Sequence, residues 1–294
     1  MTTARTGGLP HRVRDATSRI RGRYQRTLAE FFAQRLEKIH GDNAYVSFTF
    51  DDFPRSALDT GGRILQARGL RGTYYASFGL MGTHTETGDM FVADDIRQVI
   101  GEGHELGSHT YAHSHAWQTS PDEFEWSILR NNQALYGLLP GGEFGSFSFP
   151  KWVPKPSVKQ IAARHFDACR CGGQTFNADP MDVNLLKAFF IEKSRDDLAS
   201  IRQLIEQTYR TRGWLIFATH DISDDPTPYG CTPATFTHIV DHALASGARV
   251  LPVREALDEI RRSAPAPEGH PIASSAGESR PVRPASFVRS SRLG

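Results

Sequence analysis

The chain contains 294 residues, of which 39% are hydrophobic, and it carries a formal net charge of +1. This length fits one large domain or two small ones, and the hydrophobic content is sufficient for a folded core. The near-neutral charge excludes a bulk electrostatic argument for nucleic acid as the partner.

Residues 11–40 are expected to form an amphipathic helix, since apolar residues recur there at roughly helical spacing. These residues are Val13, Ala16, Ile20, Tyr24, Leu28, Phe31 and Leu36. Arginines fill much of the other surface: Arg12, Arg14, Arg19, Arg21, Arg23 and Arg26. Such a helix can associate weakly with an anionic membrane surface or with a second copy. Three acidic residues dilute the charge, which favours a helix packed on the domain or on a second subunit. Residues 1–40 are therefore assigned as an N-terminal helical extension.

Short apolar runs alternate with helical stretches between residues 41 and 262, which we assign as one catalytic domain. Strands are expected at 45–50, 72–78, 105–108, 145–149, 166–170, 186–192, 214–219 and 248–253. Helices are expected at 58–68, 94–101, 121–136, 157–164, 195–210, 232–245 and 254–262. The alternation predicts a distorted (β/α) barrel of seven or eight parallel strands, with an open doubly wound sheet as the alternative. Residues 263–294 are rich in Pro, Ser, Gly and Arg and are expected to form a disordered basic tail.

The cysteine content and the hydropathy pattern bear on the cellular compartment. Cys169, Cys171 and Cys231 are too few for a disulfide framework and are expected to be reduced thiols. No apolar run is long enough to span a membrane, and residues 1–40 lack the uninterrupted apolar region of a secretory signal. The simplest expectation is a cytoplasmic protein.

Polar residues follow three of the predicted strands. Asp51 and Asp52 follow the first strand, His109 and His113 follow the third, and His220 follows the strand 214–219. The carboxyl ends of parallel strands open onto one rim of a barrel, so these side chains can meet. Histidines at i and i+4 share one face of a helical turn, and two imidazoles with a carboxylate commonly bind Zn²⁺ or another divalent metal. Taken singly, the aspartates also fit a solvated turn, and the histidines also fit surface or packing roles.

Several motifs in order give the sequence a specific resemblance. They are Thr-Phe-Asp-Asp at 49–52, Ser-His-x-x-x-His at 108–113, Phe-Ser-Phe-Pro at 147–150 and Leu-x-x-x-x-His at 215–220. With these motifs the sequence resembles the polysaccharide deacetylases of the NodB-homology type, carbohydrate esterase family four, over residues 43–260.

The resemblance implies a metal-dependent hydrolase that removes acetyl groups from N-acetylated amino sugars in an oligo- or polysaccharide. Asp52, His109 and His113 would hold a divalent ion, with Zn²⁺ expected and Co²⁺ or Mn²⁺ as alternatives. The ion would activate water and polarise the acetyl carbonyl. Asp51 would accept the proton of the water, and His220 would protonate the leaving amine.

The third motif supplies further expected contacts and also departs from the family. The backbone N–H near Lys151 would stabilise the oxyanion, and Pro150 and Trp152 are the expected substrate contacts. Family members often carry an arginine where this chain has Ser148, and an aromatic where it has Lys151. Members also often have an Asp-Trp pair near the fifth strand, and the segment 166–171 has no Trp. These departures bear on the identity of the substrate more than on the reaction type.

The missing arginine leads to a hypothesis about Arg170, which lies at the end of the next predicted strand. An arginine side chain can reach across the spacing of neighbouring strands, so Arg170 is expected to orient Asp51 through paired hydrogen bonds. A rim arginine that pairs with Asp167 or with solvent is the alternative.

Two other functions stay open from the sequence. One is a related metal amidohydrolase that acts on a non-sugar C–N bond. The other is a non-catalytic carbohydrate-binding barrel, although binding alone does not need an acid, a base and metal ligands together.

Overall fold

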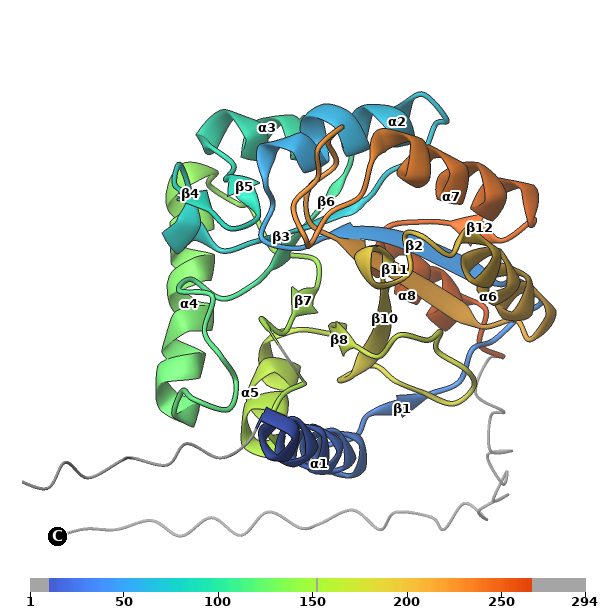
Figure 1. The fold of residues 1–294 in the computed structure, drawn as a ribbon. Helices are drawn as coiled ribbons and strands as arrows, with labels where there is room; N and C mark the ends of the chain where they lie inside the picture. The colour runs from blue at the N-terminus through green and yellow to red at the C-terminus, as the bar shows by residue number, and fades with distance from the viewer. Residues whose placement is uncertain (1–10, 152, 266–294) are drawn as a thin grey trace, which may run out of the picture. The chain divides into compact units, whose positions relative to one another are not determined.

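The computed structural model describes residues 11–151 and 153–265, and its core is a closed barrel of seven parallel strands (Figure 1). In the order in which they pair, the strands are β2 (Tyr45–Phe50), β3 (Thr73–Ala76), β6 (Glu105–Ser108), β7 (Phe147–Ser148), β8 (Cys169–Gly172), β10 (Leu186–Phe190) and β11 (Trp214–Thr219). Strand β11 pairs with β2 and closes the ring, while the short β12 (Arg249–Val250) pairs with the start of β2. The predicted distorted barrel is confirmed, and the open sheet is excluded by this closure.

Helices follow most strands and surround the barrel (Figure 1). They are α2 (Arg63–Gln66), α3 (Ala93–Gly101), α4 (Pro121–Leu138), α5 (Pro156–His165), α6 (Leu198–Arg210), α7 (Pro233–Ala245) and α8 (Val253–Arg262), with short helical turns η2 (Phe78–Leu80) and η3 (Ile191–Lys193). Ser120 and Thr232 accept hydrogen bonds from backbone N–H groups of the first turns of α4 and α7, and a proline follows each of them. These caps explain why both helices begin close to the predicted positions.

The first helical segment after β2 differs from the regular helix predicted at 58–68. Its first part, η1 (Ala57–Gly62), is a π-helical turn that continues directly into α2. Two glycines pack against the strands here: a Cβ on Gly61 would lie 3.0 Å from the Phe50 ring, and one on Gly62 would lie 2.9 Å from the Tyr74 hydroxyl. Only glycine permits so close an approach, so these two glycines determine how closely the segment packs on the sheet.

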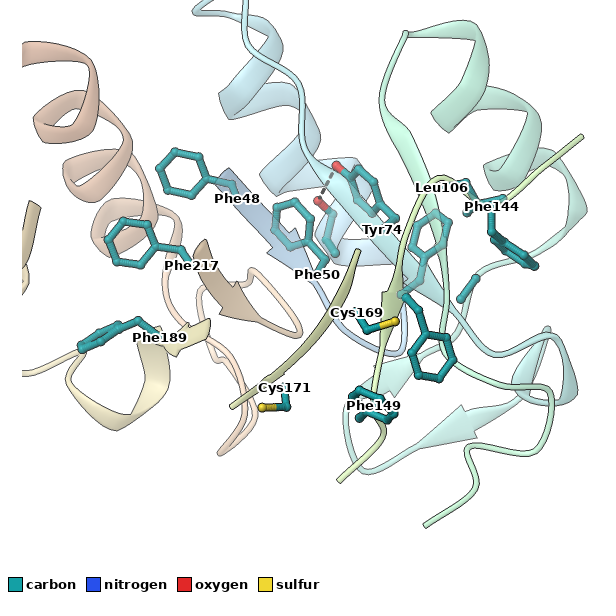
Figure 2. Close-up of a cluster of buried hydrophobic side chains, with 14 of the residues drawn as sticks. Phe48, Phe50, Tyr74, Leu106, Phe144, Phe149, Cys169, Cys171, Phe189 and Phe217 are labelled. Atoms are coloured by element: carbon teal, nitrogen blue, oxygen red, sulfur yellow. Dashed lines mark hydrogen bonds between the residues drawn. The ribbon is translucent and has the colours of Figure 1, made fainter. Parts of the chain in front are cut away.

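Strand β2 is buried on both faces, with Val46, Phe48 and Phe50 in one core cluster and Tyr45 in a second. Phe48 and Phe50 pack on Phe236 of α7, with ring centroids 5.5 and 5.6 Å apart, and Figure 2 shows both rings in the cluster between strands and helices. On the opposite face, Trp214 of the second cluster donates its indole N–H to the Ser47 hydroxyl at 3.0 Å. A strand with an apolar outer face and a more polar inner face can therefore bring polar groups to the barrel rim.

The N-terminal helix is shorter than predicted. Helix α1 (His11–Phe31) ends well before residue 40, because Ala33 adopts a left-handed backbone conformation with φ 51°. The chain then extends as β1 (Leu36–Glu37), which pairs antiparallel with β9 (Met181–Asp182). The helical prediction for residues 32–40 is therefore wrong, since pairing with a distant segment overrides the local helical spacing.

A buried lysine fixes α1 on the domain. The ammonium group of Lys159, in α5, donates to the carbonyls of Ala29 and Phe32 at 2.7 and 2.8 Å and pairs with Asp182 at 2.6 Å. Lys159 is fully buried. It neutralises the carbonyl end of the helix dipole and ties α1 to α5, which lies beside it in Figure 1. The favoured packing of this helix on the domain is thus observed.

The remaining structural expectations have mixed outcomes. Within residues 11–151 and 153–265, no helix combines the length and apolarity needed to cross a bilayer. All three cysteines are free and buried, and burial raises the pKa of Cys171 and of Cys231 to about 12. Helix α8 ends at Arg262, where the tail was predicted to begin. Residues 1–10, Trp152 and all but the first three residues of the tail lie outside the described residues.

Candidate active site at the carboxyl ends of the strands

The three predicted metal ligands meet at one end of the barrel. Asp52 follows β2, and His109 and His113 follow β6. The Asp52 Oδ1 atom lies 3.2 Å from His113 Nε2 and 3.5 Å from His109 Nε2, and one ligand atom of each residue lies within 4.8 Å of the others. In the described part of the chain, this buried Oδ1 has no hydrogen-bond partner. An orphaned carboxylate oxygen beside two imidazole nitrogens fits a divalent cation.

The protonation of the two histidines supports this fit. His109 Nδ1 lies 2.8 Å from the Ser148 carbonyl, and a carbonyl only accepts, so Nδ1 carries the hydrogen and Nε2 keeps its lone pair. Burial lowers the pKa of His109 and lowers that of His113 to about 4. Both imidazoles are therefore neutral near pH 7, which is the form that binds metal.

The backbone that carries these ligands differs from the expected helical turn. Residues 109–113 form an irregular loop, so the expectation that i and i+4 positions of a helix bring the histidines together is wrong. Instead, Asp52, Thr110 and His113 adopt left-handed conformations with φ of 60°, 59° and 50°. Such conformations cost about 1–3 kcal/mol each and concentrate at functional sites.

Beneath the predicted metal ligands, Arg170 reaches Asp51. One guanidinium nitrogen of Arg170 donates to Asp51 Oδ1, and both side chains are buried. The expected contact is present, but as a single hydrogen bond: Arg170 Nε has no partner among the described residues. The guanidinium also lies over the Tyr75 ring, 4.5 Å from its centroid. Arg170 lies below the cavity rather than on its surface, so it is a positioning residue.

Opposing effects act on the charge of Asp51. Burial alone would raise the pKa of this carboxyl, but the positive charge of Arg170 is the main opposing effect, and the pKa of Asp51 lies below its ordinary value. Ser148 contacts both residues: its hydroxyl lies 3.5 Å from Asp51 Oδ1, and its carbonyl oxygen lies 2.8 Å from His109 Nδ1. Sequence reasoning treated this serine as a lost arginine and missed both contacts.

His220 comes from the strand next to Asp51. The pairing of β11 with β2 places Thr219 opposite Phe50, so the residues that follow each strand are neighbours on the rim. His220 Nδ1 lies 3.2 Å from the Tyr229 carbonyl and therefore carries a hydrogen, which leaves Nε2 for proton exchange.

These residues border a cavity of about 420 Å³. We call Asp51, Asp52, His109 and His113 the cavity floor, and Arg26, Lys151, Glu192 and Lys193 part of the cavity wall. The other lining residues are Glu86, Thr87, Phe149, Val153, Gly172, Gly173, Gln174, Phe190, His220 and Tyr229. A second hollow of about 660 Å³, between α4 and α5, is lined by none of the predicted site residues.

Two wall residues were missed from the sequence. Burial raises the pKa of Glu192 to about 7, and its buried Oε2 lacks a hydrogen-bond partner within the described residues. Asp51 was identified as a polar residue at the carboxyl end of a predicted strand. The same criterion could have identified Glu192, because Glu192 closely follows β10. Arg26 had no such signal, since it reaches the cavity from α1, outside the barrel.

The expected substrate contacts of the third motif are only partly brought to the cavity. Lys151 lines it and adopts a left-handed backbone with φ 67°. Pro150 is buried and does not line the cavity, where Phe149 and Val153 flank it instead. Trp152 lies outside the described residues.

A closed parallel barrel with polar and titratable side chains gathered on one rim is an arrangement typical of an enzyme active site. Residues 38–165 match the model of the polysaccharide deacetylase family. The predicted resemblance to the polysaccharide deacetylases is thereby confirmed over these residues.

Solved structures agree with this assignment at the level of the fold. The chitin deacetylase of the fungal pathogen Colletotrichum lindemuthianum is 17% identical, with a TM-score of 0.52 over 75% of this chain and 90% of that chain. The family 4 carbohydrate esterase PdaA of Bacillus subtilis is 11% identical, with a TM-score of 0.52 over 80% of this chain and 88% of that one. A family 4 pseudoenzyme, a mutant of BA3943 with restored activity, is 15% identical, with a TM-score of 0.52 over 75% and 70%. Among curated proteins, none matches this sequence. Because the same fold occurs in a pseudoenzyme, function must be argued from the site.

Proposed function

We propose that this chain is a metal-dependent hydrolase that removes acetyl groups from N-acetylated amino sugars of an oligo- or polysaccharide. One observation carries the proposal: three ligand atoms placed so that they could hold a cation, a buried Asp51 carboxylate and His220, whose Nδ1 faces the Tyr229 carbonyl, border the same cavity. The polysaccharide deacetylase family model and the fold shared with a chitin deacetylase support the substrate class.

Asp52, His109 and His113 would hold the metal. When bound there, a divalent ion would supply Lewis acidity that activates water and polarises the acetyl carbonyl. Two imidazoles and a carboxylate with open positions suit Zn²⁺, and Co²⁺ and Mn²⁺ accept the same ligands. The Ser148 carbonyl orients His109 so that its Nε2 lone pair faces the other two ligands.

Asp51 and His220 move the protons. Arg170 keeps Asp51 ionised within a buried site, so the carboxylate can accept the proton of the attacking water. Protonated His220 gives its Nε2 proton to the departing nitrogen, because an amine anion is too basic to leave. The products are acetate and a free amino sugar. The proton that Asp51 took from water replaces the proton that His220 gave to the amine, so both groups return to their starting protonation states. The backbone N–H near Lys151 is proposed to stabilise the oxyanion.

The proposal is tested by a deacetylation screen with the full chain. N-acetylglucosamine oligomers, acetylated xylan and acetylated non-sugar amides would be incubated with the protein and Zn²⁺, Co²⁺ or Mn²⁺, and acetate would be measured. The expected result is acetate from the N-acetylated sugars with a matching yield of free amine. Acetate only from non-sugar amides or only from xylan would contradict the proposal and assign a related hydrolase. Sugar binding without acetate release would assign a non-catalytic barrel.

A further inference from the structure

Helix α1 presents an apolar stripe to solvent. Ile20, Tyr24 and Phe31 are 68%, 61% and 75% exposed, and their spacing places them on one face of the helix. The helix contacts the domain through the opposite face, where Gln25 and Ala29 are buried. This orientation is the reverse of ordinary amphipathic packing, in which the apolar stripe faces the core.

The exposed stripe belongs to a helix whose position is fixed. Lys159 caps its carbonyl end from α5, and the Asn184 side chain donates to the Ala33 carbonyl at 2.9 Å just beyond the helix. Just past the helix, Phe32 is exposed as well, at 54%. Within the stripe only Thr27 is polar, and an apolar stripe held outward by specific contacts indicates an interaction surface.

The charges around the stripe indicate what it binds. Arg21 and Arg23 are exposed and lie on either side of the stripe in helical projection. Glu30 is the single acidic residue of α1 from residue 20 onward, and it lies 3.5 Å from Lys187. The partner must therefore combine an apolar phase with negative charge.

This charge pattern argues against two other occupants. A parallel copy of α1 would bring Arg21 and Arg23 against the same arginines. In an antiparallel copy the single acidic residue from residue 20 onward that they could face is Glu30, which already lies beside Lys187. The C-terminal tail would also bring arginines against arginines, since it carries Arg280, Arg283, Arg289 and Arg292. Acidic phospholipid headgroups above acyl chains match both the apolar stripe and its basic flanks.

We propose that α1 docks this protein on an anionic lipid bilayer, with Ile20, Tyr24 and Phe31 inserted at the headgroup level and Arg21 and Arg23 on the acidic lipids. Docking is a property of the helix surface and does not depend on the proposed reaction. The same helix places Arg26 at the catalytic cavity, so docking would bring that cavity close to the bilayer surface.

The test is co-sedimentation of the full chain with phosphatidylcholine vesicles that contain or lack phosphatidylglycerol. Binding is expected to the anionic vesicles, and the combined changes Ile20→Ser, Tyr24→Ser and Phe31→Ser should weaken it about tenfold or more. Arg21→Gln with Arg23→Gln should abolish the preference for anionic vesicles.

A matched control removes other exposed aromatics. Trp126 and Tyr136 on α4 are 55% and 62% exposed, and replacing both with serine should leave vesicle binding unchanged. All variants should retain wild-type acetate release from a soluble N-acetylated oligosaccharide, which separates a failure of docking from a failure of the proposed function. The proposal is overturned if the wild type does not sediment with anionic vesicles, or if the triple change leaves binding intact. It is also overturned if the stripe mediates a dimer that the triple change dissociates, with no vesicle binding.

Discussion

The cavity floor and the cavity wall differ in how they are held. Asp51, Asp52 and His109 on the floor are at most 6% exposed and follow strand ends within one closed barrel. On the wall, Arg26 and Lys193 are exposed, and Arg26 comes from α1 outside the barrel. The floor residues, whose proposed roles need fixed distances, thus lie where packing is tightest. The wall residues, which we expect to contact substrate, lie on elements whose positions can vary without disturbing the fold.

This difference predicts that floor variants change metal content or turnover, whereas wall variants change substrate affinity. The largest effects should come from the metal ligands. Asp52→Ala, His109→Ala and His113→Ala should each lose bound metal and reduce acetate release to background, because two ligands cannot retain the ion. Elemental analysis and acetate assays measure both quantities. His115→Ala is the matched control, and unchanged metal content in all three ligand variants would contradict the assignment.

Next in size are the proton-transfer residues. Asp51→Asn and His220→Ala should each lower kcat by about 10²-fold or more, the usual contribution of a general acid or base. Both variants should keep their metal, since neither residue is among its proposed ligands. Steady-state kinetics with matched elemental analysis tests this, and a wild-type kcat in Asp51→Asn would remove the proposed base.

A smaller effect is expected at the positioning residue. Arg170 lowers the pKa of Asp51, so Arg170→Met should raise that pKa and shift the acidic limb of the pH–rate profile to higher pH. Arg170→Lys keeps the charge but changes the hydrogen-bond geometry, and it should restore the limb while kcat stays lower. Arg55→Lys, in the Arg55–Asp95 pair away from the floor, is the control. An unshifted limb in a folded Arg170→Met protein would show that the contact is only structural.

On the wall, Arg26→Gln should raise KM about threefold and leave kcat and metal content unchanged. An exposed polar contact is worth at most about 1 kcal/mol, which sets this modest size. Arg23→Gln, on the same helix but directed elsewhere, should have no effect on a soluble substrate. A lower kcat in Arg26→Gln would contradict the assignment of turnover to the cavity floor and of substrate affinity to the cavity wall.

The smallest effect concerns the pH dependence of stability at Glu192. Its folded pKa of about 7 exceeds the ordinary glutamate value of 4.5, so the folded state binds more protons between these values and stability falls as pH rises. Glu192→Gln removes this loss, so its advantage in unfolding free energy should grow between pH 4.5 and 7, by on the order of 1 kcal/mol. Thermal unfolding at several pH values measures it, with exposed Glu206→Gln as the control. A difference that stays constant over this range would contradict a perturbed Glu192.

The barrel and most of its floor were predictable because the signals are local. An apolar strand such as 45–50 ends in Asp51 and Asp52, and parallel closure brings all such ends together. The contact of Arg170 with Asp51 followed from the same reasoning about neighbouring strands. What the sequence did not reveal depends on tertiary packing: the loop that turns His113 toward Asp52, and the Ser148 carbonyl that orients His109.

Helix α1 shows more clearly that contacts which depend on tertiary packing cannot be predicted from local sequence patterns. Its apolar spacing predicted a helix correctly up to Phe31, but it gave no indication that Ile20, Tyr24 and Phe31 face solvent. The lysine that fixes the helix, Lys159, lies far along the chain and is an unremarkable residue of α5 in the sequence. Arg26 reaches the cavity only because of that contact, so no local pattern could have placed it in the wall.

The central claim is that the floor binds a metal and uses it to deacetylate an amino sugar. The most direct measurement strips the full chain of metal with a chelator and then titrates Zn²⁺ back, while acetate release from an N-acetylglucosamine oligomer is followed. The account predicts no acetate from the stripped protein, and activity that rises with Zn²⁺ and saturates at one equivalent per chain. Full activity without metal, or one equivalent of bound Zn²⁺ with no acetate from any N-acetylated sugar, would contradict it.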